Sequence, residues 1–278
     1  MPDWQRLHQL LEREPAVLAT VVRVQGSTPR EAGAWMAITA SGLIGSIGGG
    51  QLEFDVAAEA RSALTEGGII GPLRRYALGP TLGQCCGGVV HVRLEWLDVS
   101  HREGLRQRLT PPPLMRVALF GGGHVGRAIA ELFAKLPVAL HWIDSRDEIF
   151  PTDLPGQIET EHSDPVHAAV RGLAPGSRVL VMSFSHAEDL DIVAACLTRA
   201  REHNDLPFIG LIGSKSKWAS FRHRLQARGF AETDLARITS PIGIPGVTGK
   251  QPDVIALAAV AQLMQTQQML EPPANANR

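Results

Sequence analysis

Short runs of apolar residues alternate with longer amphipathic stretches in the second half of the chain. The pattern of a buried strand occurs at residues 115–120 (MRVALF), 138–143 (VALHWI), 178–182 (RVLVM) and 207–212 (PFIGLI). Stretches with helical spacing of apolar residues alternate with these runs, at residues 125–136, 188–201 and 217–228. Strands that alternate with helices are typical of a parallel sheet covered by helices. We therefore predict a Rossmann-like, doubly wound α/β domain over residues 115–270.

The first part of the chain has shorter apolar runs and clustered glycines. A strand-like run, VLATVVRVQ, ends at Gln25. Residues 89–96 alternate between apolar and polar, which places Val90, Val92, Leu94 and Trp96 on one face of a strand. Residues 51–64 have the spacing of an amphipathic helix. This pattern predicts a smaller, mixed α/β domain over residues 1–110.

Residues 98–114 separate the two patterns. Their proline run at 111–113 suits neither a helix interior nor a central strand, so we place the domain boundary there. The C-terminal residues 271–278 (EPPANANR) have nothing to bury, and we expect a disordered tail.

The composition excludes several classes of partner. The chain has 278 residues, 44% of them hydrophobic, which suits two globular domains. Its net charge of -1 provides no overall positive field for nucleic acid or for an anionic membrane surface. The N-terminus lacks the features of a secretory signal, and no apolar run reaches the length of a membrane span. We expect a cytoplasmic protein with no nucleic-acid or membrane partner.

A glycine-rich loop follows the first strand of the predicted Rossmann-like domain. Gly121, Gly123 and Gly126 fit the dinucleotide-binding pattern G-x-G-x-x-G, between a strand and a helix as that pattern requires. Asp144 ends the next strand, 18 residues after the last glycine, near the spacing of an acid that binds a ribose hydroxyl. Arg146 suits a phosphate, so these residues do not separate NAD from NADP. The alternative is that the glycines only form a tight turn.

Two adjacent cysteines lie in a second glycine-rich segment, Gln84, Cys85, Cys86, Gly87 and Gly88. The chain has three cysteines, an odd number that does not suit a disulfide framework. Soft thiolates suit molybdenum, copper or sulfur transfer, whereas a zinc site would need further ligands from scattered histidines. The alternative is a pair of inert, buried cysteines.

Two further loops suit a phosphate group. Residues 26–30 (GSTPR) follow a predicted strand, and residues 45–50 (GSIGGG) precede a predicted helix. Glycines at a helix start can leave backbone N–H groups free for an anion, which makes Gly48, Gly49 and Gly50 candidates. Arg30 adds a fork of N–H donors. Each loop taken alone is also compatible with an ordinary turn.

Seven segments together carry a resemblance to a known family. They are GSTPREAGAWM (26–36), GSIGGGQLE (45–53), LGPTLGQCCGG (78–88), LFGGGHVGRAIA (119–130), WIDSRDEIFP (142–151), GLIGSKSKWASFRHRL (210–225) and SPIGIPGVTGKQPDVIALAAVAQLM (240–264). On these segments the chain resembles the xanthine dehydrogenase accessory proteins of the XdhC/CoxI type. It departs from them at residues 183–187, where SFSHA replaces a frequent Thr-His-x-His-Ala run, so a role for the first of those histidines is not carried over.

The resemblance implies a chaperone in the maturation of molybdenum hydroxylases of purine catabolism, and not a self-contained metabolic enzyme. Such a protein binds the molybdenum cofactor (molybdopterin), supports its sulfuration with a cysteine desulfurase, and inserts it into the molybdenum subunit of xanthine dehydrogenase. Cys85 and Cys86 would contact the metal or relay sulfur. Gln84, Gly87, Gly88, Arg30 and the glycines of residues 48–50 would hold the rest of the cofactor.

Two other functions are also compatible with the sequence. One is an NAD(P)-dependent oxidoreductase that uses Gly121, Gly123, Gly126 and Asp144. The other is an interaction protein without a bound cofactor. A homodimer is expected, because a carrier site and a handover surface can form between subunits.

Overall fold

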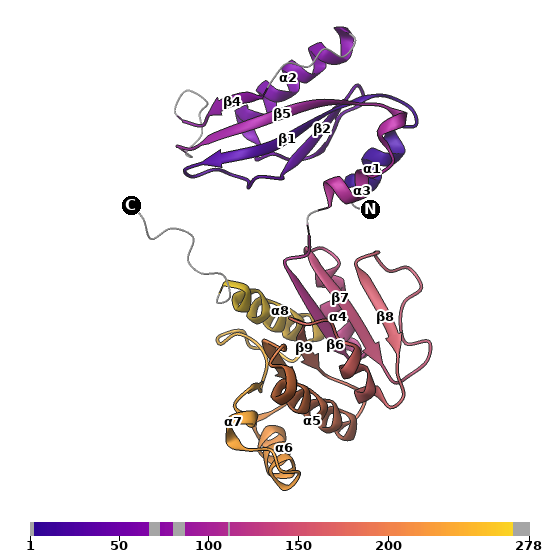
Figure 1. Cartoon of the computed structure of the whole chain (residues 1–278), viewed down its shortest axis with the longest axis vertical. Helices are drawn as coiled ribbons and strands as arrows, with labels where there is room; N and C mark the ends of the chain where they lie inside the picture. The colour runs from indigo at the N-terminus through magenta and orange to yellow at the C-terminus, as the bar shows by residue number, and fades with distance from the viewer. Residues whose placement is uncertain (1–2, 67–72, 80–86, 111, 269–278) are drawn as a thin grey trace. The chain divides into compact units, whose positions relative to one another are not determined.

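The computed structural model describes residues 3–66, 73–79, 87–110 and 112–268. It divides into two compact units, Met1–Pro111 and Pro112–Arg278, each with a sheet of its own (Figure 1). The tail expected at residues 271–278 lies outside the described residues. None of the helices in the described residues has the length and apolar character needed to cross a membrane.

The first unit is a five-stranded antiparallel sheet in the order β3-β2-β1-β5-β4. Its elements are α1 (Asp3–Leu10), β1 (Ala16–Gln25), β2 (Trp35–Thr39), β3 (Leu43–Gly45), α2 (Gly50–Glu66), β4 (Arg74–Ala77), β5 (Val89–Leu97), the 3-10 turn η2 (Val99–His101) and α3 (Leu105–Leu109). Helix α2 packs on one face of the sheet, over a core that contains Val90, Val92 and Leu94. Trp96 is partly buried against the same core, so the predicted apolar face of β5 is the face under α2.

The opposite face of this sheet is covered at one end by α1 and α3. Their buried residues Leu7, Leu105 and Leu109 pack against Leu18 of β1 and Leu97 of β5. Residues 99–109, which lie within the segment 98–114 that separates the two sequence patterns, belong to the first unit. The reason is that Leu105 and Leu109 complete a core that the sheet and α1 leave open.

The second unit is a six-stranded sheet in the order β11-β10-β9-β6-β7-β8, with every pair of neighbours parallel. Its elements are β6 (Met115–Phe120), α4 (His124–Phe133), β7 (Val138–Asp144), β8 (Ile158–His162), η3 (Val166–Gly172), β9 (Arg178–Val181), α5 (His186–His203), β10 (Phe208–Leu211), α6 (Lys215–Ala227), α7 (Glu232–Leu235), β11 (Ile238–Thr239) and α8 (Pro252–Gln268). This strand order is that of doubly wound dinucleotide-binding folds.

Alternating side chains of the parallel strands fill two cores. Along β6, Ala118 and Phe120 face a core completed by α5, α6, α7 and η3, whereas Val117 and Leu119 face one completed by α4 and α8. Helices therefore cover both faces of the sheet, as Figure 1 shows for α4, α5 and α8. The predicted mixed α/β class with a Rossmann-like C-terminal sheet is confirmed.

Candidate functional site

Two glycine-rich loops of the first unit contact the GSTPR loop that follows β1. A Cβ atom on Gly88 would lie 2.3 Å from the backbone oxygen of Ser27, and one on Gly48 would lie 2.3 Å from Cγ of Pro29. These approaches are too close for any side chain, so glycine is required at both positions. Residues that the sequence predicted as one site therefore come together here: Arg30 with the loop that holds Gly48, and Gly88 with Ser27.

Gln84, Cys85 and Cys86 lie outside the described residues, but both flanks of their segment are described. The N–H of Leu78 donates to the carbonyl oxygen of Gly88 at 2.8 Å, directly beyond the paired ends of β4 and β5. Gly87 is exposed, and a Cβ there would meet no atom within 4 Å. The described residues on the two sides of this segment therefore lie next to each other, and Gly88 lies beside the GSTPR loop. Within the described ranges, no group of His, Cys, Asp and Glu is arranged to hold a metal ion.

The carboxylate of Glu53 occupies the GSIGGG loop. Its Oε1 accepts hydrogen bonds from the N–H groups of Ile47 (2.9 Å), Gly48 (3.2 Å) and Gly49 (2.9 Å), and from the hydroxyl of Ser46 (2.6 Å). Burial would raise the pKa of Glu53, but the hydrogen bonds from Ser46 and from the loop lower it. A phosphate at Gly48 and Gly49 would have to displace this carboxylate. The sequence reasoning missed Glu53, although a glutamate early in a helix is a known capping signal.

Arg30 links the two loops. Its Nη1 donates to the carbonyl oxygen of Ser46 at 3.3 Å, and its Nη2 lies 3.4 Å from the exposed Glu31. The Arg30 side chain is 41% exposed. A guanidinium has five N–H donors, so Arg30 keeps donors for an anionic ligand.

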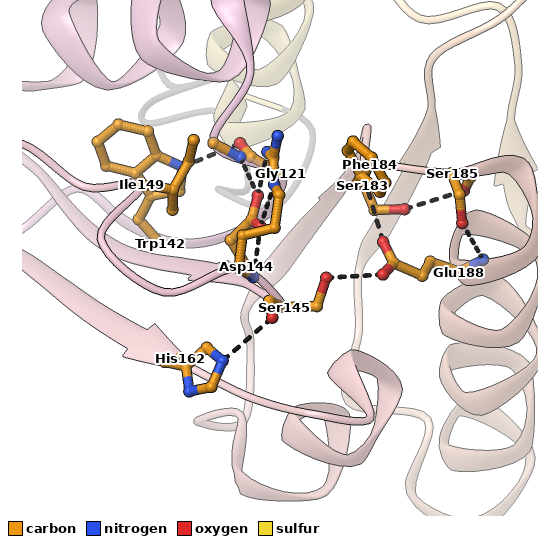
Figure 2. A network of polar contacts seen from close by, with 12 residues as sticks. Gly121, Trp142, Asp144, Ser145, Ile149, His162, Ser183, Phe184, Ser185 and Glu188 are labelled. Carbon is orange, nitrogen blue, oxygen red and sulfur yellow. Dashed lines mark hydrogen bonds and ion pairs between the residues drawn. The ribbon is translucent and has the colours of Figure 1, made fainter.

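The glycine loop of the second unit is held against the end of β7 (Figure 2). The indole Nε1 of Trp142 donates to the carbonyl oxygen of Gly121 at 2.9 Å. A Cβ on Gly126 would lie 2.0 Å from the same oxygen, whereas a Cβ on Gly123 would meet no atom within 4 Å. Gly121 and Gly126 therefore serve close packing. Gly123, at the N-terminus of α4, is the glycine of the pattern that faces open space.

Both carboxylate oxygens of Asp144 are engaged by groups of the protein. They accept from the N–H of Gly122 (2.5 Å), from the N–H of Arg146 (2.9 Å), and from Nε and Nη2 of Arg146 (2.8 Å each). The Asp144 side chain is 1% exposed. Burial would raise the pKa of Asp144, but the hydrogen bonds and charge of Arg146 and the Gly122 N–H lower it. A ribose hydroxyl would have to compete with these donors.

A second set of contacts ties the ends of β7 and β9 to α5 (Figure 2). Ser145 Oγ donates to Glu188 at 2.6 Å, and the backbone N–H of Phe184 donates to the same carboxylate at 3.2 Å. The exposed ring of Phe184 lies 4.8 Å from the Arg146 guanidinium. Phe184 occupies the position at which the family that this chain resembles often has histidine. Here its ring offers an aromatic face to the Arg146 guanidinium.

Because its folded-state pKa is lowered, Asp144 should stabilise the protein above about pH 4, the usual pKa of an aspartate, and lose this contribution as the pH falls further. Asp144→Asn removes the charge. We expect the difference in free energy of unfolding between wild type and Asp144→Asn to be full at pH 7 and to shrink below about pH 4. Urea titrations across this range measure it. A difference that does not change with pH would show that Asp144 does not act through its charge.

Two family models match the chain, one within each unit. A model described as the XdhC Rossmann domain matches residues 117–263, more than half of the chain. The chain belongs to the XdhC family. A second model, described as the XdhC and CoxI family, matches residues 10–77 of this XdhC-family protein. The resemblance seen in the sequence is confirmed by both.

The chain is also similar to a curated protein and to a solved structure. It is 29% identical over 256 residues to the uncharacterized protein YqeB of Escherichia coli (strain K12), which covers 90% of this chain and 43% of YqeB. The chain therefore spans less than half the length of that relative. A crystal structure described as a xanthine dehydrogenase (BH1974) from Bacillus halodurans superposes with a TM-score of 0.73 and 21% identity, over 99% of this chain and 98% of that one. The similarity to this crystal structure supports the fold.

Proposed function

We propose that this XdhC-family protein binds the molybdenum cofactor, supports its sulfuration and delivers it to xanthine dehydrogenase. Membership of the family suggests a role in the maturation of that enzyme. The observation that carries the finer proposal is the contact of the GSTPR loop with both Gly48 and Gly88. Arg30, a cation with free donors, belongs to the same loop that contacts Gly88, and Gly88 follows the cysteine pair closely in the sequence.

The residues of this region have the chemistry that such a cargo requires. Cys85 and Cys86 are soft thiols that suit molybdenum or sulfur transfer. Arg30 suits the anionic part of the cofactor. The third cysteine, Cys196, is fully buried in the second unit, and burial raises the pKa of its thiol to about 12. Sulfur chemistry is therefore assigned to the adjacent pair.

A carrier needs partners on either side of the binding step. A cysteine desulfurase would supply sulfur, and the molybdenum subunit of xanthine dehydrogenase would receive the finished cofactor. In this scheme the protein shields a labile ligand from water and releases it, which requires reversible binding. A homodimer remains part of the proposal.

The proposal predicts that Cys85→Ala/Cys86→Ala lowers cofactor retention at least about tenfold, because two soft ligands are lost. The purified protein is mixed with freshly released molybdenum cofactor and separated by gel filtration, and molybdenum and pterin are assayed per protomer. Cys196→Ala is the matched control, since it removes the remaining cysteine of the chain. We expect it to retain the cofactor as the wild type does.

Equal retention by the double variant and the wild type would contradict the assignment to the cysteine pair. Absence of retention by the wild type would contradict the proposed function. It would favour the alternative oxidoreductase, which is tested by titration with NADH and NADPH. The contacts of Asp144 argue against that alternative, because the carboxylate oxygens that would bind a ribose already accept from Gly122 and Arg146.

A further inference from the structure

Three arginines lie on adjacent strands toward the end of the first sheet where β4 ends and β5 begins. Arg23 of β1 is directly opposite His91 of β5, and His91 is directly opposite Arg75 of β4. Side chains that oppose each other in antiparallel strands lie on the same face. Arg93, two residues after His91, shares that face as well. We call these residues, Arg23, Arg75, His91 and Arg93, the arginine row.

The arginine row lies on the face opposite α2. Val90 and Val92, the neighbours of His91 in the sequence, point into the core under α2. Side chains alternate along a strand, so His91 and Arg93 point to the other face. The core under α1 and α3 lies toward the other end of this face, at Leu18 and Leu97. Arg23, Arg75 and Arg93 are all exposed.

The three arginines carry no ion pair or side-chain hydrogen bond within the part of the chain that the structure describes. Other arginines of this unit do: Arg74 pairs with Glu59 at 2.6 Å, and Arg108 pairs with Glu95 at 3.0 Å. Glu95 is the one acidic residue of β5, and its carboxylate is paired with Arg108. The buried Nδ1 of His91 also has no hydrogen-bond partner among the described residues. Like charges on neighbouring strands repel each other, so this arrangement favours a bound anion.

The spacing suits a phosphate group. Neighbouring strands are about 4.8 Å apart, so the Cα atoms of Arg23 and Arg75 are separated by roughly 10 Å, with His91 between them. Two long arginine side chains can reach across that distance to one anion. Guanidinium groups bind phosphate oxygens through paired hydrogen bonds.

The row also lies next to the candidate site. Two residues after Arg23, β1 ends at Gln25 and enters the GSTPR loop. Two residues before His91, β5 begins at Val89, directly after Gly88. We propose that the arginine row binds the phosphate end of the carried pterin cofactor. This inference rests on the proposed function and adds the residues that recognise the phosphorylated part of the cargo.

The test uses the full chain with Arg23→Gln/Arg75→Gln. We expect cofactor retention to weaken at least about tenfold, the factor that corresponds to loss of one charge-assisted hydrogen bond. The matched control is Arg13→Gln/Arg61→Gln, which removes the same charge from two exposed arginines elsewhere in this unit. The control should retain the cofactor, and circular dichroism should show the same melting for both variants.

A second measurement separates this inference from the proposed function. Calorimetric titration with pyrophosphate, in protein free of cofactor, should show binding by the wild type and the control and its loss in Arg23→Gln/Arg75→Gln. If that result is obtained but the wild type retains no cofactor, phosphate recognition is supported and the proposed function fails. If the variant equals the control in both assays, the arginine row does not bind phosphate. Loss of binding to the xanthine dehydrogenase subunit alone would overturn the inference in favour of a protein-docking surface.

Discussion

Gly126→Ala is expected to lower the free energy of unfolding of the second unit by about 3 kcal/mol, the upper part of the range for overpacked interiors. A methyl group at this position would lie 2.0 Å from the carbonyl oxygen of Gly121 and 3.0 Å from its carbon. Both atoms belong to the backbone, and Gly121 is itself held by hydrogen bonds to the indole of Trp142 and to the carbonyl oxygen of Ile143. The loop and α4 would therefore have to separate. Urea denaturation followed by circular dichroism measures the loss.

Gly123→Ala is the matched control in the same loop. Gly123 has φ of -70°, which any residue can adopt, and a Cβ there would meet no atom within 4 Å. We expect a loss of about 1 kcal/mol, because alanine is a poorer helix N-cap than glycine but meets no clash here. Equal destabilisation by the two variants would mean that close packing of α4 on the loop is not what requires Gly126.

Asp189→Ala is expected to cost about 3–5 kcal/mol, the range observed when one partner of a buried ion pair is removed. Asp189 accepts from Nζ of Lys217 at 2.5 Å and from the N–H and hydroxyl of Ser183, each at 2.8 Å. The two charged side chains are 3% and 11% exposed. Without the carboxylate, the Lys217 ammonium keeps the carbonyl oxygen of Ile212 as its hydrogen-bond acceptor among the described residues, in surroundings that exclude water. Urea denaturation measures the loss in this variant also.

The control for Asp189 is an exposed ion pair anchored on the same helix. Asp191 pairs with Arg228 at 2.7 Å, and both side chains are more than 40% exposed. Asp191→Ala should therefore change the free energy of unfolding by less than about 1 kcal/mol. If Asp189→Ala and Asp191→Ala had equal effects, burial would not be the source of the strength of the Lys217–Asp189 pair.

Much of the second unit could be predicted because its strands are buried on both faces. Each of β6, β7, β9 and β10 is a nearly continuous apolar run, and the helices between them have clear periodicity. The strand β8 was missed. Only Ile158 of its five residues is buried, since it lies at the edge of the sheet, and an edge strand leaves no apolar run to detect.

The first unit was harder to predict, because its strands β2 and β3 lie among glycines and turns. Residues 35–39 are almost fully buried, but five residues are too few to separate a strand from a buried turn of helix by periodicity. The helix α3 was hidden for a related reason. Its two buried leucines have meaning only once the core between β1, β5 and α1 exists.

The candidate site residues also divide into those that local sequence patterns indicate and those that only tertiary packing brings together. Local patterns were sufficient to predict the mixed α/β class with a Rossmann-like second unit and to nominate the glycine loops and the cysteine pair as candidates, because turn chemistry and hydrophobic periodicity act between residues close in sequence. They did not reveal that Glu53 fills one loop or that Arg146 and Gly122 engage Asp144. Strand register alone brings Arg23, His91 and Arg75 into one row, although Arg23 is far from the other two along the chain. Such contacts depend on packing between distant segments, and only the tertiary structure decides which donors and charges meet.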